Sequence, residues 1–262
     1  MKNCVVYLSH LINKNIINQY LELCDMVKDE YDVYFIFDSN SNSYELTKQY
    51  SDQINFIYIN SKEDFSKLGY KRFHDSDTIG IAYFFLQYFI HILGYNQYDN
   101  YWFIEYDVKY LGDWKNLLKD IDSNINHDLV SQYVYMYNED EDKHWYWYYN
   151  EFTLNPKYYN YDKNNLVRSF NPFFRLSKES SYFIHNELNT RDICGHYEYI
   201  LATLLYNNGF TLFSLNNNGS LQFTTDEYNH KYSNCNTFRA TPEITNIDVN
   251  LNGKNMLYHP IK

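Results

Sequence analysis

Two acidic residues separated by one position, Glu105 and Asp107, follow an apolar run and are the side chains best placed to do chemistry. Because side chains alternate along a strand, we expect both to project on one side and Tyr106 to point away. Two neighbouring carboxylates repel each other unless a cation neutralises them, and such a pair of oxygen ligands suits Mg²⁺ or Mn²⁺. The ion would bridge a diphosphate and stabilise the charge on a departing nucleoside diphosphate. The alternative is that both acids cap the turn at Gly112.

The elements that must hold these acids follow from the pattern of apolar residues. Short apolar runs predict buried strands, and the amphipathic stretches between them predict helices. The strands are expected at residues 4–8, 33–37 and 54–59, and the helices at residues 11–28 and 43–53. This alternation is typical of βαβ units with right-handed crossovers and a largely parallel sheet. Ligands of such sheets bind beyond the carboxyl ends of the strands, where Asp38, Glu105 and Asp107 stand.

The pattern continues along the rest of the chain, with N-cap candidates at residues 75–78 and a helix stop at Gly94. The further expected elements are helix 79–93, strand 101–106, helix 114–121, strand 129–136, a long loop 138–162, strand 173–176, helix 196–206, and strands and loops over 211–262. We find neither a Pro/Ser-rich linker nor an internal repeat. A single domain over residues 1–262 is therefore expected.

The bulk composition narrows the classes of partner. The 262-residue chain has a formal net charge of −11, which argues against nucleic acid, because phosphate backbones are bound through clustered Lys and Arg. A single nucleotide diphosphate stays compatible with this charge if a divalent cation supplies positive charge locally. Aromatic residues make up 20% of the chain, but they are spread along it, so we attribute most of them to compositional bias rather than to stacking platforms.

The cysteines and the apolar segments indicate a soluble protein of a reducing compartment. Cys4, Cys24, Cys194 and Cys235 form no CxxC pair, so we expect buried free thiols rather than a zinc or redox site. The N-terminus lacks the layout of a signal peptide, and the apolar stretch 79–93 is shorter than the about 20 residues that cross a bilayer. We expect no membrane span and a cytoplasmic location; the sequence does not fix the oligomeric state.

A longer string around the two acids carries a family resemblance. Residues 98–114 read YDNYWFIEYDVKYLGDW. This string resembles the corresponding region of a group of GT-A-fold glycosyltransferases in which Glu-x-Asp-Val stands in for the usual Asp-x-Asp. Three further features follow in matching order, and they are Arg175-Leu176-Ser177, Gly195-His196-Tyr197-Glu198 and the terminal Tyr258-His259-Pro260-Ile261-Lys262. The resemblance spans most of the chain but rests on short motifs.

The resemblance implies a fold and an activity. The expected fold is a single α/β, GT-A-like (Rossmann-like) domain with a mixed, mostly parallel central sheet flanked by helices. Residues 1–110 would form the half that binds the nucleotide-sugar, and residues 111–262 the acceptor-binding half and the C-terminal tail. The expected activity is transfer of a sugar from a nucleotide-sugar, with UDP favoured, to a hydroxyl of a glycan, a glycoprotein or a small molecule. Mn²⁺ or Mg²⁺ would be the cofactor.

The resemblance also implies roles for individual residues. Asp107 would ligate the metal directly, Glu105 would contact the donor ribose or the metal through water, and His259 would be a late third metal ligand. Asp38 would contact the uracil or the ribose of the donor. Two of these residues have an equally simple alternative, Asp38 as a solvated turn acid and His259 as a tail residue without a role.

The remaining candidates concern proton transfer and phosphate contacts. Glu198 opens a predicted helix and is the candidate general base for the acceptor hydroxyl, which would make the transfer inverting. Asp192 is the reserve base, and the alternative for Glu198 is an acid stabilised by the helix dipole. Arg72 and Lys262 are candidates for contacts to the diphosphate, although exposed basic residues mostly solvate a surface and terminal residues often fray.

Two further features are candidates for substrate contacts. Arg175 would orient a phosphate or a sugar carboxylate. The aromatic run 144–149 would form a platform for the acceptor sugar, with ordinary packing of the long loop as the alternative.

Two other functions compete with glycosyl transfer. A sugar nucleotidyltransferase shares the sheet and the metal, but it usually opens with a Gly-rich phosphate loop, and residues 8–13 contain no glycine. A catalytically silent carbohydrate-binding protein on the same fold is the third interpretation. Stabilisation only by UDP with metal would indicate the enzyme, and stabilisation by free glycans without nucleotide would indicate the binding protein.

Overall fold

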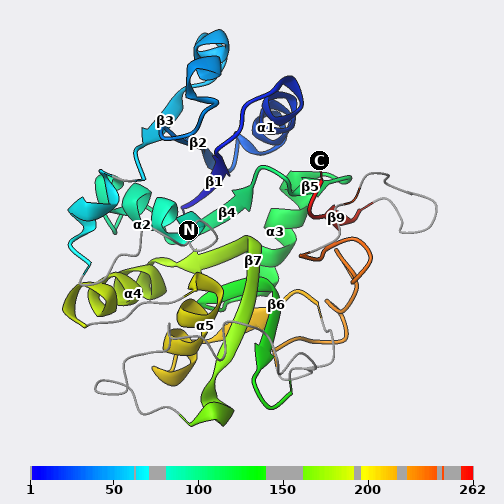
Figure 1. The fold of residues 1–262 in the computed structure, drawn as a ribbon. Coiled ribbons are helices and arrows are strands. Elements are labelled where there is room, and N and C mark those ends of the chain that lie inside the picture. Colours follow the sequence, from blue (N-terminus) through cyan, green and yellow to red (C-terminus); the bar gives the residue numbers. More distant parts are fainter. Residues whose placement is uncertain are drawn as a thin grey trace.

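A seven-stranded mixed sheet organises the fold in the computed structural model, which describes residues 2–61, 63–70, 81–139, 162–191, 196–216, 223–240, 244 and 255–261 (Figure 1). The strand order is β3-β2-β1-β4-β7-β6-β8. The strands are β1 (Asn3–Ser9), β2 (Asp32–Asp38), β3 (Phe56–Ile59), β4 (Asn100–Glu105), β6 (Leu129–Met136), β7 (Val167–Ser177) and β8 (Leu212–Ser214).

The strand directions confirm the expected α/β fold with a mixed, mostly parallel sheet. β1 pairs in parallel with both β2 and β4, and β2 pairs in parallel with β3. β7 is antiparallel to both of its neighbours, β4 and β6, and β8 is parallel to β6. The carboxyl ends of β1, β2 and β4 therefore meet at one edge of the sheet.

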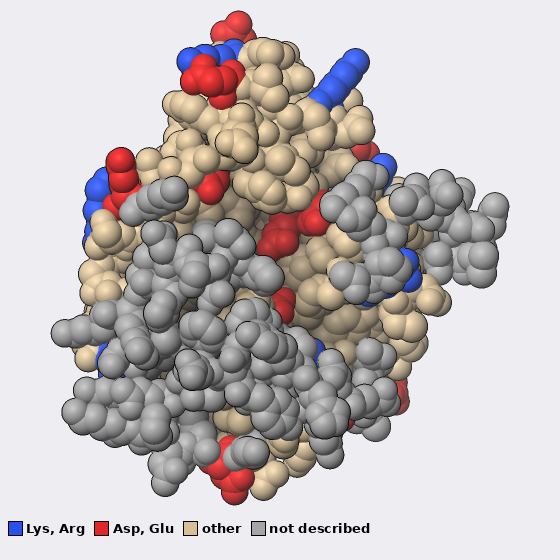
Figure 2. All heavy atoms as spheres, in the orientation of Figure 1, with Lys and Arg blue, Asp and Glu red and all other residues tan. Residues whose placement is uncertain are grey.

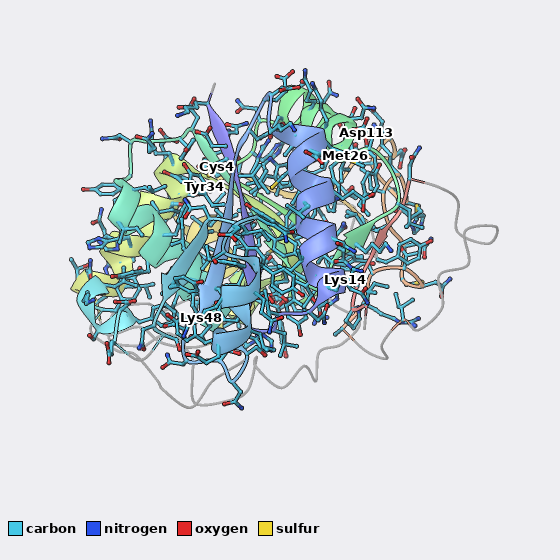
Figure 3. The ribbon with its side chains drawn as sticks, turned by 90° about the horizontal axis from the view of Figure 1, so that it is seen from above. Cys4, Lys14, Met26, Tyr34, Lys48 and Asp113 are labelled. Carbon is cyan, nitrogen blue, oxygen red and sulfur yellow. The ribbon has the colours of Figure 1, made fainter. Side chains whose placement is uncertain are left out.

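Helices cover both faces of the sheet. They are α1 (Lys14–Val27), α2 (Ile81–Leu93), α3 (Trp114–Asn124), α4 (Lys178–Thr190) and α5 (Tyr197–Asn207). Apolar side chains of α1 and α3 join one core cluster, and those of α2, α4 and α5 join the cluster on the other face. Seen from above, α1 lies along the strands, with Lys14 and Met26 marking its two ends (Figure 3). Its first turn is capped by Asn13, whose side chain accepts a hydrogen bond from the Ile16 amide.

The structure differs from the prediction at several elements. The expected helix over 43–53 is a 3₁₀ helix, Tyr44–Tyr50. The expected strand over 173–176 is much longer, because β7 runs from Val167 to Ser177. Helix α4 was not predicted at all, since buried Ser180, Ser181 and Glu187 interrupt the apolar stripe that reveals a helix in a sequence.

The C-terminal segment returns to the sheet edge that carries the acids. Strand β9 (Leu257–Tyr258) pairs antiparallel with β5 (Lys109–Tyr110), which directly follows the end of β4. Gly112 follows β5, and a Cβ there would lie 2.5 Å from the Tyr110 ring and 2.7 Å from the Asn255 side chain, so a larger residue would have to displace these side chains. A segment more than 140 positions away in the sequence is thereby fixed beside the Glu105–Asp107 pair.

The membrane and cysteine expectations can be compared with the described residues. In this part of the chain, every helix falls short of the length and apolar character that a bilayer span requires. Cys4 is buried, Cys24 is half-buried and Cys235 is exposed, so the expectation of buried free thiols is wrong for Cys235. Cys194, the N-cap candidates at 75–78 and the aromatic run 144–149 lie outside the described residues.

Candidate active site

A tight turn brings the two acids together, rather than the alternation along a strand that the sequence suggested. Strand β4 ends at Glu105, and the Val108 amide donates a hydrogen bond to the Glu105 carbonyl at 3.0 Å, closing a four-residue turn. Tyr106 and Asp107 occupy the middle of that turn. The Tyr106 ring turns away and meets the His10 ring edge-on, with the ring centroids 5.1 Å apart. The expected direction of the side chains holds, but its cause is the turn.

The C-terminal segment supplies the third side chain of the cluster. The Ile261 amide donates to the Asp107 carbonyl at 3.0 Å, and the β5–β9 pairing places His259 next to the turn. Ligand atoms of Glu105, Asp107 and His259 all lie within 4.8 Å of one another. Acidic side chains are visible at the bottom of a hollow near the centre of this face (Figure 2).

The orientation of His259 is fixed by its backbone surroundings. Nδ1 lies 2.8 Å from the Arg239 carbonyl oxygen, which can only accept, so Nδ1 carries the proton. Nε2 then presents its lone pair and lies 3.5 Å from Asp107 Oδ1. Burial lowers the pKa of His259, while the carboxylate of Asp107 acts in the opposite direction. The lone pair of the neutral imidazole thus faces a carboxylate oxygen, so that two hydrogen-bond acceptors lie close together without a proton between them.

This donor set fits a divalent cation. Ligands of an octahedral ion at about 2.1 Å lie about 3.0 Å apart when adjacent and about 4.2 Å apart when opposite. The separation of 3.5 Å between His259 and Asp107 falls inside that range, and the ligand atom of Glu105 lies within 4.8 Å of both. The hydrogen bond from the outer nitrogen of an imidazole to a carbonyl is also the usual support of a metal-binding histidine. Two carboxylates and one imidazole suit Mn²⁺ and Mg²⁺.

Glu105 sits in an environment that disfavours its charge. Burial raises the pKa of Glu105 well above its usual value, and the neighbouring charges of Asp107 and Glu198 raise it further. A hydrogen bond with the hydroxyl of Tyr197 opposes these effects. A cation at this point would remove the repulsion. Helix α3 has its own cap, because Asp113 accepts from the Asn116 amide at 3.1 Å. The alternative that Glu105 and Asp107 cap the turn at Gly112 stays a second interpretation.

Glu198 occupies the first turn of α5, as predicted, and its carboxyl group lies in a polar niche. Oε1 accepts a hydrogen bond from the Asn171 amide at 3.2 Å, and Oε2 lies 3.7 Å from Nδ1 of His196. Burial raises the pKa of Glu198 to about 7, against the effects of the Asn171 amide and of the Arg168 charge. A carboxyl group with such a pKa is suited to take a proton near neutral pH.

A cavity of about 230 Å³ opens beside Glu198. It is lined by Tyr133, Tyr135, Arg168, Ser169, Phe170, Glu198, Cys235, Phe238, Arg239 and Ala240. Two of its walls contact the metal-ligand candidate, since the rings of Phe170 and Phe238 lie 5.4 and 5.2 Å from the His259 ring. The cavity and the acidic cluster are therefore adjacent parts of one site.

Asp38 lies at the same sheet edge but outside the cluster. It ends β2, and β1 separates it from β4. Its Oδ1 accepts from the Asn40 amide at 3.0 Å, and Ser61 Oγ lies 3.3 Å from its carboxylate, which are the contacts of an acid that shapes a turn. Burial lowers the pKa of the nearby His10, and the charges of Asp38 and Asp107 both act in the opposite direction. The role of Asp38 in nucleotide binding stays a prediction.

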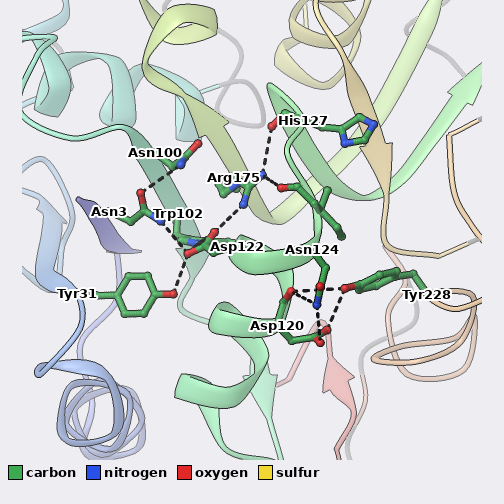
Figure 4. A network of polar contacts seen from close by, with 11 residues as sticks. Asn3, Tyr31, Asn100, Trp102, Asp120, Asp122, Asn124, His127, Arg175 and Tyr228 are labelled. Carbon is green, nitrogen blue, oxygen red and sulfur yellow. Dashed lines mark hydrogen bonds and ion pairs between the residues drawn. The ribbon is translucent and has the colours of Figure 1, made fainter. Parts of the chain in front are cut away.

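Arg175 was placed wrongly by the sequence, because it is a buried structural residue. Its Nη1 donates to Asp122 Oδ1 at 2.6 Å, and its Nη2 donates to the Ile125 carbonyl at 2.6 Å (Figure 4). Asp122 also accepts from Tyr31 and Trp102. With 2% of its side chain exposed, Arg175 cannot orient a phosphate or a sugar.

Some site residues predicted from the sequence lie outside the described residues, and some residues of the site were not predicted. Asp192, Arg72 and Lys262 are not among the described residues. No pattern in the sequence pointed to Arg168 and Arg239 in the cavity, or to the hydrogen bond between Tyr197 and Glu105. Only the position of Tyr197 beside Glu198 in the predicted helix pointed to this region.

Comparisons with known proteins find similarity to solved structures. No protein-family model and no curated protein matches the sequence. Among solved structures, the chain is similar to mouse xyloside xylosyltransferase 1, with 10% identity over 82% of this chain and 86% of that chain and a TM-score of 0.42. It is also similar to 4-diphosphocytidyl-2C-methyl-D-erythritol synthase from Anaerococcus prevotii, with 10% identity over 87% of this chain and 94% of that chain and a TM-score of 0.48. At this identity the function must be argued from the site itself.

Proposed function

We propose that this protein is a metal-dependent glycosyltransferase that moves a sugar from a UDP-sugar to a hydroxyl acceptor. The observation that carries the proposal is the distance of 3.5 Å between His259 Nε2 and Asp107 Oδ1. The imidazole proton is on Nδ1, which donates it to the Arg239 carbonyl oxygen. Two acceptors held face to face beside a second carboxylate favour a bound cation. The motif resemblance described above supports the choice of a nucleotide-sugar.

The residues of the cluster divide into ligands and supports. Asp107 and His259 would hold Mn²⁺ or Mg²⁺, and Glu105 would join them directly or through water. When bound, the ion supplies positive charge to the departing diphosphate. Tyr197 orients Glu105 through its hydroxyl group. Asp38 would contact the ribose or the uracil, and Arg72 and Lys262 the phosphates.

The transfer needs one base, and Glu198 is the candidate. The acceptor oxygen forms a bond to the anomeric carbon while the bond to the diphosphate oxygen breaks, and the hydroxyl proton passes to Glu198. This single displacement inverts the anomeric configuration. Asp192 is the second candidate for the base. Residues 1–110 would form the donor half of a single domain, and residues 111–262 the acceptor half.

A donor screen tests the proposal. The protein is incubated with Mn²⁺ and a panel of UDP- and GDP-sugars, and released nucleoside diphosphate is measured with and without acceptor alcohols. We expect release from at least one UDP-sugar and loss of release on chelation. Release of pyrophosphate from UTP and a sugar 1-phosphate would instead assign a nucleotidyltransferase.

A binding experiment tests the metal assignment separately. Thermal shift with UDP and Mn²⁺ should show stabilisation that needs both components. Asp107→Ala should abolish this stabilisation without loss of fold, and the matched variant at exposed Asp25, Asp25→Ala, should keep it. Unchanged UDP binding by Asp107→Ala would show that Asp107 is not a metal ligand. Stabilisation by free glycans alone would indicate a catalytically silent carbohydrate-binding protein.

A further inference from the structure

A carboxylate of α3 is connected to His259 through a chain of hydrogen bonds. Resting on the proposed function, in which His259 is a metal ligand, we infer that Asp120 is a positioning residue that holds His259 through segment 228–239. The connection has three links. Asp120 binds side chains of the segment, the segment pairs with the C-terminal strand β9, and the last residue of the segment fixes the imidazole ring.

The first link is the convergence of three donors on the carboxylate of Asp120. Oδ2 accepts from the hydroxyl of Tyr232 at 2.6 Å, from Lys231 Nζ at 2.9 Å and from the hydroxyl of Tyr228 at 3.1 Å (Figure 4). Both tyrosines are buried, so their hydroxyl groups need acceptors. Burial raises the pKa of Asp120, but these hydrogen bonds lower it, and the net pKa lies below the usual value. The carboxylate is therefore charged at neutral pH, and charge-assisted hydrogen bonds are the stronger ones.

The second link joins segment 228–239 to the C-terminal segment through the backbone. The Leu257 amide donates to the Tyr232 carbonyl at 2.7 Å, and the His259 amide donates to the Thr237 carbonyl at 2.9 Å. Leu257 belongs to β9. The tyrosine that binds the α3 carboxylate with its side chain thus holds β9 with its backbone.

The third link fixes the imidazole ring itself. The carbonyl oxygen of Arg239 accepts from His259 Nδ1 at 2.8 Å, and the Arg239 amide donates to the His259 carbonyl at 3.2 Å. The ring of Phe238 lies 5.2 Å from the imidazole ring. A displacement of segment 228–239 would therefore move the groups that select the tautomer and the direction of Nε2.

Segment 228–239 also has anchors on the sheet side. The hydroxyl of Tyr133, in β6, donates to the Phe238 carbonyl at 3.0 Å, and Asn216 Nδ2 donates to the Ser233 carbonyl at 2.7 Å. These neutral bonds hold the second half of the segment, whereas Asp120 holds the first half. Loss of the Asp120 charge should therefore loosen the segment without unfolding the protein.

The imidazole of His259 reports its own position without metal or nucleotide. The intact protein is labelled with ¹⁵N-histidine, and long-range ¹H–¹⁵N spectra at mildly alkaline pH distinguish a protonated from an unprotonated ring nitrogen. His259→Gln assigns the signals. We expect a single tautomer with protonated Nδ1 in the wild type. In Asp120→Asn the two nitrogen signals should move toward the average of both tautomers, because the Arg239 carbonyl is no longer held in place.

Asp128→Asn is the matched control, since Asp128 also accepts three hydrogen bonds. Its carboxylate accepts from Ser177 Oγ and from the amide and the hydroxyl of Thr211, each at 2.9 Å. These residues lie where β4 begins, at the end of the sheet opposite the acidic cluster. Asp128→Asn should leave the His259 signals unchanged. Equal changes in both variants would show a general loss of stability and would overturn the inference.

A second variant breaks the same link from the other side. Tyr232→Phe keeps the ring and removes the hydroxyl that donates to Asp120, so it should change the His259 signals in the same direction. The double variant should change them little more than Asp120→Asn does, because both substitutions break one hydrogen bond. If Asp120→Asn fails to fold, Tyr232→Phe decides.

The affinity for Mn²⁺ with excess UDP, measured on the same proteins, separates this inference from the proposed function. Asp120→Asn should bind Mn²⁺ about three- to tenfold more weakly, which is less than loss of a direct partner of a metal ligand causes. Unchanged His259 signals or an unchanged Mn²⁺ affinity in Asp120→Asn would overturn the inference. A wild-type protein that binds no Mn²⁺ with UDP would reject the metal-dependent transferase, and changed His259 signals would still show that Asp120 positions His259.

Discussion

The Nδ1 atom of His259 donates a hydrogen bond of 2.8 Å to the carbonyl oxygen of Arg239, and this bond leaves Nε2 as the atom that faces Asp107. A backbone carbonyl thus selects the tautomer and the direction of the imidazole. The rings of Phe170 and Phe238 pack against it and hold its plane. The C-terminal segment is thereby an integral part of the site rather than a loose tail.

Replacement of His259 tests this arrangement directly. His259→Gln should lower the affinity for Mn²⁺ in the presence of UDP by about 10–100-fold, because the cation loses a ligand that is already oriented. The affinity is measured by calorimetric titration of Mn²⁺ into protein with excess UDP. His91→Gln, at an exposed histidine of α2, is the matched control and should leave the affinity unchanged. An unchanged affinity in His259→Gln would return His259 to a purely structural role.

Tyr197 is expected to position Glu105 without touching the substrate. Tyr197→Phe removes the hydroxyl that hydrogen-bonds Glu105, so Glu105 loses its orientation and the support of its charged form. We expect about tenfold weaker Mn²⁺ binding. The affinity is measured with the titration used for His259→Gln.

The control for this variant is Tyr206→Phe, at a half-buried tyrosine of the same helix. It should bind Mn²⁺ like the wild type. If both tyrosine variants weaken Mn²⁺ binding equally, the effect comes from repacking of α5 and not from the hydrogen bond to Glu105.

The pKa of Glu198 predicts the pH dependence of transfer. Burial raises this pKa to about 7, and a base must be deprotonated to accept a proton. At saturating Mn²⁺ and donor, kcat should therefore rise with pH up to about 7 and level off above it. Glu198→Gln should lower kcat by about 10²–10⁴-fold and remove this rising limb.

The alternative base gives a different outcome in the same experiment. If Glu198→Gln keeps the rate and the rising limb, proton transfer belongs to another group, and Asp192→Asn is then the variant to test. A lower rate with an unchanged limb would show that Glu198 binds the acceptor but does not titrate in the reaction.

Local signals in the sequence located part of the sheet and the acidic pair. Apolar runs marked β1, β2 and β4, and the acids at the ends of β2 and β4 followed from the rule for parallel sheets. The reason given for the convergence of Glu105 and Asp107 was nevertheless wrong. The turn that orients Asp107 depends on the hydrogen bond from Val108 to Glu105 and on the contact of Ile261 with Asp107, and no short-range pattern reveals the second.

Other parts of the site depend on contacts between distant segments. Arg239 reaches the site because its backbone pairs with His259, and Arg168 because β7 extends well beyond the predicted strand. Neither stands in a motif. Arg175 shows the opposite error, because a motif position suggested a ligand contact where the fold uses a buried ion pair. A charged residue in a sequence carries no mark that distinguishes these two uses.

The buried pair of Arg175 and Asp122 leads to a prediction about stability. Asp122→Asn would leave the guanidinium group, 2% exposed, without its counter-charge and would weaken the contacts from Tyr31 and Trp102. Breaking such a pair should lower the free energy of unfolding by about 3–5 kcal/mol. Unfolding in urea would measure this loss. Asp25→Asn, at an exposed acid, should change it by no more than about 0.5 kcal/mol. Because the pair lies away from the acidic cluster, the folded Asp122→Asn protein should bind UDP with Mn²⁺ as the wild type does; lost UDP binding at full stability would instead make this pair part of the site.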